Sequence, residues 1–136
     1  MLLTAVIATG VAALLLSRTL HQIQEKSQVT RHIQATELAK SLAEALIKGR
    51  EFTSGHPYYG GMGFRYSEGI FVFGSINDGY IWSPSEERAE LEQDKNRMEF
   101  SDRAGFESWV AERLCEKDFA HSHPWLSLHA LKAAAL

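Results

Sequence analysis

The densest group of potential metal ligands lies near the C-terminus and comprises Cys115, His121, His123 and His129. Thiolate and imidazole groups are ligands that zinc prefers, so these residues suggest a metal-dependent hydrolase. Their spacing lacks the paired C-x₂-C and H-x₃₋₅-H arrangements typical of zinc sites. We therefore favour exposed or helix-capping histidines and predict no cofactor; a bound metal would take its ligands from His121, His123 and His129.

The other reactive residue types have structural explanations. Cys115, the single cysteine, follows Leu114 at the end of an expected helix, which predicts a buried and inert thiol rather than a nucleophile. Several carboxylates fall in expected turns or at a helix start, where solvation or capping explains them. These carboxylates are Glu68, Asp78, Glu86 and Glu87. We predict that the protein is not an enzyme.

Aromatic residues and glycine-rich turns suggest a protein-binding surface instead. Residues 50–63 form a glycine-rich connection that contains two tyrosines, and further aromatic residues follow it. Loops often carry function, and aromatic side chains on a rigid sheet can anchor a partner. The alternative is that these aromatic residues cover the edge of the core. Our interface candidates are His56, Tyr58, Tyr59, Asn77, Asp78 and Tyr80.

The elements that would position these residues follow from local patterns. Short β-rich runs predict four strands at residues 64–66, 70–73, 80–82 and 97–101. The first three are separated by turns that end in Gly69 and Gly79, the signature of antiparallel hairpins. Ser83 followed by Pro84 predicts a short helix. An amphipathic helix should follow Asp102 to about Glu116, and a last helix should begin at Pro124.

One long helix should precede the sheet and end before Gly49. Residues 1–16 are apolar on every side, and no charge occurs before Arg18. With Arg18 extending outward, Met1–Leu20 would span the roughly 30 Å hydrocarbon core, so we expect a membrane anchor. A buried core helix or a signal peptide are the alternatives. We expect an anchor at 1–20, a helical stalk at 21–34 and a globular domain at 35–136.

The second part of this helix carries apolar residues at spacings of three and four, which predicts one packed face. They are Ala35, Leu38, Ala39, Leu42, Ala45 and Leu46. We therefore predict an α+β fold in which a long N-terminal helix with an apolar first half packs against a four-stranded antiparallel meander, with further helices at the C-terminus.

Charge and cysteine content bear on location and partners. The cations Arg18, Lys26 and Arg31 follow the apolar run while none precedes it, so the positive-inside bias places the globular domain on the cytoplasmic side of the membrane. A single cysteine is compatible with that reducing compartment. The net charge of −3, with both signs mixed along 136 residues, argues against nucleic-acid binding.

Residues 35–114 resemble small bacterial immunity-type proteins of polymorphic toxin loci. The similar segments are ATELAKSLAEALIKG, HPYYGGMGF, IFVFGSINDGY and MEFSDRAGFESWVAERL. The resemblance implies a small α+β domain that inhibits a toxin by occlusion, without catalysis. The apolar N-terminal run is not part of that pattern and suggests protection at the inner membrane.

The expected architecture is also similar to type IV pilins and minor pseudopilins, in which a long helix with an apolar first half packs under an antiparallel sheet. The sequence departs from that family at two points. No leader ending in glycine precedes the apolar run, and Ala5 stands where a glutamate is expected. This resemblance implies a subunit of a pilus or secretion system, which we keep as the alternative.

Overall fold

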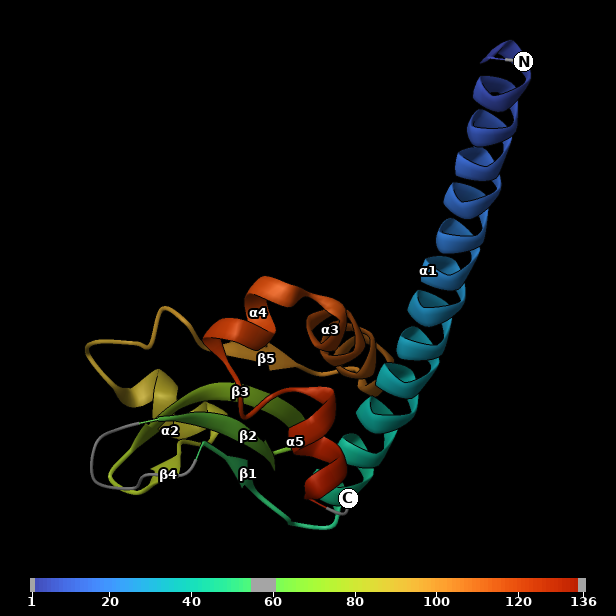
Figure 1. Cartoon of the computed structure of the whole chain (residues 1–136). Coiled ribbons are helices and arrows are strands. Elements are labelled where there is room, and N and C mark those ends of the chain that lie inside the picture. The colour runs from blue at the N-terminus through green and yellow to red at the C-terminus, as the bar shows by residue number, and fades with distance from the viewer. Residues whose placement is uncertain (1, 55–60, 135–136) are drawn as a thin grey trace. The chain divides into compact units, whose positions relative to one another are not determined.

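The computed structural model describes the backbone of residues 2–54 and 61–134 and the side chains of 11–54, 61–119, 121–127 and 130–134. The chain divides into two compact units, Met1–Ile33 and Gln34–Leu136. One helix, α1 (Leu2–Ile47), contributes residues to both units. Figure 1 shows this helix and the labelled elements that follow it.

In the first unit, α1 exposes its apolar residues. Large side chains from Val11 to Ile33 are half or more exposed, including Leu14, Leu15 and Leu16. Among the described residues, no helix is both long and apolar enough to cross a membrane. The side chains of residues 1–10, half of the expected anchor Met1–Leu20, lie outside the described residues.

The second unit contains an antiparallel sheet, which together with the helices confirms the α+β fold. Its strands are β1 (Phe52–Thr53), β2 (Met62–Ser67), β3 (Ile70–Asn77), β4 (Tyr80–Ile81) and β5 (Met98–Phe100). The order is β1-β2-β3-β4, and β5 also pairs with β3. The short strand β1 was not expected from the sequence.

Two tight turns connect the central strands, as the glycine positions predicted. Glu68 and Gly69 have φ of 56° and 73°, and Asp78 and Gly79 have φ of 55° and 91°. Two successive residues with positive φ form the turn whose twist matches that of antiparallel strands. Glycine adopts this conformation without steric cost, which explains its place at the second position of each turn.

The described residues after β4 form four helices: α2 (Pro84–Ala89), α3 (Arg103–Cys115), α4 (Lys117–Ser122) and α5 (Leu128–Ala133). The expected caps are confirmed, since the side chains of Ser83 and Asp102 accept hydrogen bonds from the N–H groups of Glu86 and Ala104. The last helix begins at Leu128 rather than Pro124, because Ser127 caps it by accepting a bond from Ala130 N–H.

The core of the second unit lies between α1, one face of the sheet and the C-terminal helices. Its α1 members are Ala35, Ala39, Leu42, Ala43 and Leu46. Phe71 of β3 stacks on Phe106 of α3 with ring centroids 4.4 Å apart. Phe64 of β2 contacts Phe106 edge-on at 5.6 Å. The apolar stripe of α1 therefore packs as predicted, except that Leu38 and Ala45 are only partly buried.

Candidate functional site

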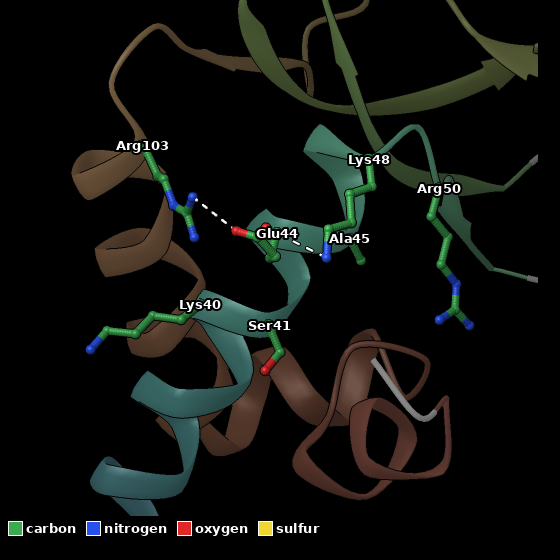
Figure 2. A pocket seen from close by; sticks show the side chains of 7 residues that line it. All are labelled: Lys40, Ser41, Glu44, Ala45, Lys48, Arg50 and Arg103. Atoms are coloured by element: carbon green, nitrogen blue, oxygen red, sulfur yellow. Dashed lines mark ion pairs between the residues drawn. The ribbon is translucent and has the colours of Figure 1, made fainter.

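A pocket of about 560 Å³ lies beside the last turns of α1 (Figure 2). Its volume falls in the range of about 300 to 1,000 Å³ that is usual for ligand sites. The lining residues are Lys40, Ser41, Glu44, Ala45, Lys48, Arg50 and Arg103. All of them belong to the unit Gln34–Leu136.

Helical spacing places four of these residues on one surface of α1, and Lys48 directly follows the helix on the same side, with its N–H donating to Glu44 O at 3.2 Å. Lys40, Glu44 and Lys48 are four residues apart and therefore lie above one another, while Ser41 and Ala45 form the adjacent row. The neighbouring positions Leu42 and Leu46 are buried in the core. The amphipathic pattern that directs leucine inward thus directs lysine and glutamate toward the pocket.

The end of α1 brings Arg50 back beside the helix. Gly49 adopts φ of 93°, and its N–H donates to Leu46 O at 3.0 Å, while Arg50 N–H donates to Ala45 O at 3.0 Å. This pair of bonds is the Schellman motif, for which a glycine with positive φ is favoured. The predicted glycine terminus is therefore confirmed. Arg50 Nη2 then donates to Ala134 O at 2.9 Å.

Arg103 supplies the opposite wall as the first residue of α3. Its Nη1 lies 3.2 Å from Glu44 Oε2, and its Nε donates to Glu107 Oε1 at 2.7 Å. The hydrogen bond to Glu107 raises the pKa of Arg103, against a smaller opposing effect of burial. Arg103 therefore remains charged at every physiological pH.

The pocket is rich in positive charge. Four cations and one carboxylate line it, a formal charge of +3. Glu44 Oε1 also lies 3.6 Å from Lys48 Nζ. Lys40 has no hydrogen-bond or ion-pair partner among the residues that the structure describes. This arrangement suits an anionic group, because ammonium and guanidinium groups bind carboxylate and phosphate oxygens.

Three of the predicted interface residues, Asn77, Asp78 and Tyr80, lie elsewhere, at the hairpin that joins β3 and β4. Tyr80 is 39% exposed and donates its hydroxyl to Glu86 Oε2 at 2.8 Å. That hydrogen bond raises the pKa of Tyr80. The guanidinium carbon of Arg65 lies 5.8 Å from the Tyr80 ring centroid. Asn77 pairs with Tyr80 in the ladder, and Asp78 occupies the turn.

The remaining predicted interface residues, His56, Tyr58 and Tyr59, lie outside the described residues. The described part of the predicted interface therefore consists of Asn77, Asp78 and Tyr80 at the tip of the β3–β4 hairpin.

The structure describes the side chains of two of the three candidate metal ligands, His121 and His123. His121 is exposed, whereas His123 is half-buried and stacks on Phe119 with centroids 4.1 Å apart. The side chain of His129 lies outside the described residues. Within the described part of the chain, no group of three histidine, cysteine or acidic residues could hold a metal ion. Cys115 is half-buried rather than fully buried as expected, because it sits at the last turn of α3.

The pocket was not predicted, because the sequence pattern of its lining residues is that of an ordinary solvated helix face. The available signal was the run Lys40, Glu44, Lys48 and Arg50, in which three cations surround one carboxylate at the end of the expected helix. The contribution of Arg103, which follows more than fifty residues later, could not be read from spacing.

Comparisons with protein-family models, with curated proteins and with solved structures found no match for this chain.

Proposed function

We propose that this protein is a membrane-anchored, non-catalytic binding protein. Its first twenty residues would lie in the bacterial inner membrane, and the unit Gln34–Leu136 would bind a protein partner on the cytoplasmic side. The observation that carries this proposal is the exposure of Leu14, Leu15 and Leu16, three successive large apolar side chains on α1.

Successive residues of a helix point about 100° apart. Leu14, Leu15 and Leu16 therefore cover more than half of the helix circumference, and Val11 and Leu20 extend the apolar surface along it. A single partner helix covers only one stripe, whereas lipid surrounds a helix on every side. This supports a bilayer rather than a packed interface as the environment of the segment.

The hairpin tip supports protein binding. Tyr80 is held by its hydrogen bond to Glu86 and by Arg65 beside its ring. A fixed, partly exposed tyrosine loses little conformational entropy on binding, which is one reason why tyrosine is frequent among the residues that dominate binding energy. The resemblance to immunity-type proteins makes a toxin the proposed partner, inhibited by occlusion.

A second candidate is a subunit of a pilus or secretion system. The observation that favours it is the continuity of α1, whose 46 residues run without a break into the core of the second unit. A long helix that ends beneath an antiparallel sheet is the feature on which the similarity to pilins rests.

Paired substitutions test the anchor. The double variant Leu15→Lys, Leu16→Lys places two charges in the apolar run, each costing up to about 3 kcal/mol, the value for the centre of a bilayer. The matched control is Val29→Lys, Ile33→Lys; Val29 and Leu15 are both 59% exposed, but Val29 lies outside the run. In bacterial membrane fractionation, we expect the wild type and the control to sediment with membranes and the Leu15, Leu16 variant to become soluble. A soluble wild type, or equal sedimentation of both variants, contradicts the anchor.

Cross-linking in membranes followed by protein identification tests the partner. Capture of a toxin that is lost in Tyr80→Ala supports the immunity-type function, whereas capture of other assembly subunits supports the second candidate. If Tyr80→Ala leaves every captured protein unchanged, the proposed binding surface is wrong.

A further inference from the structure

We propose that the pocket beside α1 is an anion site that takes acidic side chains of a protein partner, and that Glu44 is its internal, displaceable occupant. The assignment of a protein as the source of the anion rests on the proposed function. The pocket itself is argued only from the unit Gln34–Leu136.

Positive charge is concentrated locally at the pocket. The whole chain has a net charge of −3, yet the pocket lining has a formal charge of +3. Cations gathered within one concave surface raise the local concentration of anions. In Figure 2, Arg103 and Arg50 flank the last turns of α1, with Glu44 between them.

Several hydrogen-bond donors at the pocket are unused. Arg103 uses Nε for Glu107 and Nη1 for Glu44, which leaves its Nη2 group for a ligand. Lys40 offers three donors, since no described residue pairs with it. Arg50 uses Nη2 for Ala134 O and keeps its other nitrogen atoms. An incoming anion would thus find unused donors on Arg103, Lys40 and Arg50.

The pocket already holds one anionic group, the carboxylate of Glu44. Glu44 bridges Arg103 at 3.2 Å and Lys48 at 3.6 Å, so the pocket binds one carboxylate of its own chain. The Glu44 side chain is 51% exposed, and exposed ion pairs of this kind contribute little to stability. A carboxylate from another protein can therefore replace Glu44 at small cost.

The lining also favours a peptide over a bare inorganic anion. The pocket has apolar surface between its charges, which comes from Ala45 and the aliphatic stems of Lys40 and Lys48. The volume of about 560 Å³ far exceeds that of one carboxylate and suits several residues of an acidic segment.

Titration of full-length protein in non-ionic detergent with labelled hexaglutamate tests the site. At about 50 mM salt we expect saturable binding that Lys40→Gln weakens five-fold or more. Glu44→Gln should tighten binding three-fold or more, because it removes the competing carboxylate. Lys95→Gln, an equal loss of one exposed cation outside the pocket, is the matched control and should leave binding unchanged.

Lys40 has no partner in the described structure, so Lys40→Gln leaves the fold unaffected and a change in affinity reports on the pocket. Absence of binding, or equal effects of Lys40→Gln and Lys95→Gln, overturns the anion site. Tighter, Lys40-dependent binding of inorganic pyrophosphate than of hexaglutamate overturns the acidic-protein assignment. Failure of the membrane anchor would appear in fractionation alone and leaves this titration unaffected.

Discussion

At the scale of single residues, Arg97 shows how one polar side chain organises the second face of the sheet. Its side chain is 6% exposed and pairs with Glu87, which is 8% exposed, at 3.8 Å. A Cβ atom on Gly74 of β3 would meet Arg97 Cγ at 3.5 Å. This is an ordinary van der Waals distance, so the arginine stem lies against β3 at this position without requiring glycine there. The cost of removing both charges from water offsets much of their attraction, so a buried ion pair of this kind adds little net stability.

Asp94 attaches the loop before β5 to the sheet. Its Oδ2 accepts a bond from Ser75 N–H at 3.0 Å, and its Oδ1 accepts one from Asn96 N–H at 2.9 Å. Burial alone would raise the pKa of Asp94, but together the hydrogen bonds from the two backbone amides and the nearby Arg97 outweigh it and lower the pKa below 3.8. The ionised carboxylate of Asp94 therefore stabilises the fold above pH 3.8. This contribution is lost as the pH falls through the folded-state pKa of Asp94.

We expect Asp94→Asn to lower the free energy of unfolding at pH 7 by roughly 1 kcal/mol, since hydrogen bonds to a partly exposed carboxylate are weaker than buried ones. The variant should also lose less stability than the wild type between about pH 4 and pH 2. Urea unfolding at several pH values measures both effects. Glu92→Gln, in the same loop and exposed, is the control; equal pH profiles for Asp94→Asn and the wild type would refute the role.

At the scale of elements, β1 depends on a close approach to β2. Phe52 pairs with Phe64 and Thr53 pairs with Gly63. A Cβ atom at Gly63 would lie 2.6 Å from Phe52 O and 2.9 Å from Ile81 Cδ1. The glycine therefore permits two strands and a buried side chain to meet at one point.

Gly63→Ala should destabilise the unit Gln34–Leu136 by about 1 to 3 kcal/mol, because the added methyl group overpacks the β1–β2 ladder. Gly105→Ala is the matched change on α3, where an added Cβ would meet Asp102 at 3.8 Å or more. That variant should be more stable than the wild type by up to about 1 kcal/mol, because alanine favours a helix. The midpoints of urea unfolding for the two variants and the wild type test both expectations. A Gly63→Ala midpoint at or above that of the wild type would show that the strands can move apart.

At the scale of the whole molecule, the boundary between the two units falls inside α1 rather than at its end. The unit Gln34–Leu136 takes five buried residues of its core from the last part of α1. Leu42 and Leu46 are fully or almost fully buried there. This part of the helix is therefore a component of the globular unit and not a linker.

A chain that begins at Gln34 should fold, whereas a chain that begins at Glu51 should not. Loss of Leu42 and Leu46 alone costs about 2 to 5 kcal/mol each, which approaches the entire 5 to 15 kcal/mol stability of a small domain. Dispersed amide signals and a cooperative urea transition would report folding. A cooperative transition in the shorter chain would mean that the sheet and α3 form a core without α1.

Sequence alone determined the features whose signals are local. The glycine turns, the caps Ser83 and Asp102, the helix end at Gly49 and the apolar stripe of α1 follow from side-chain conformation and hydrogen bonding within a few residues. The antiparallel α+β class followed from them. Only the tertiary structure decided where the last strand pairs: β4 pairs with Ile76 and Asn77, leaving Phe71–Phe73 of β3 for β5.

The cationic pocket was likewise decided by tertiary packing. Arg103 joins Lys40 and Glu44 only because Phe106 of α3 and Leu42 of α1 enter the same core and carry their exposed neighbours together. The interaction between two charges depends on their distance in space. For residues on remote segments, the spacing along the chain does not give that distance. The hydrophobic pattern could therefore predict that both helices pack, but not which of their charged residues would meet.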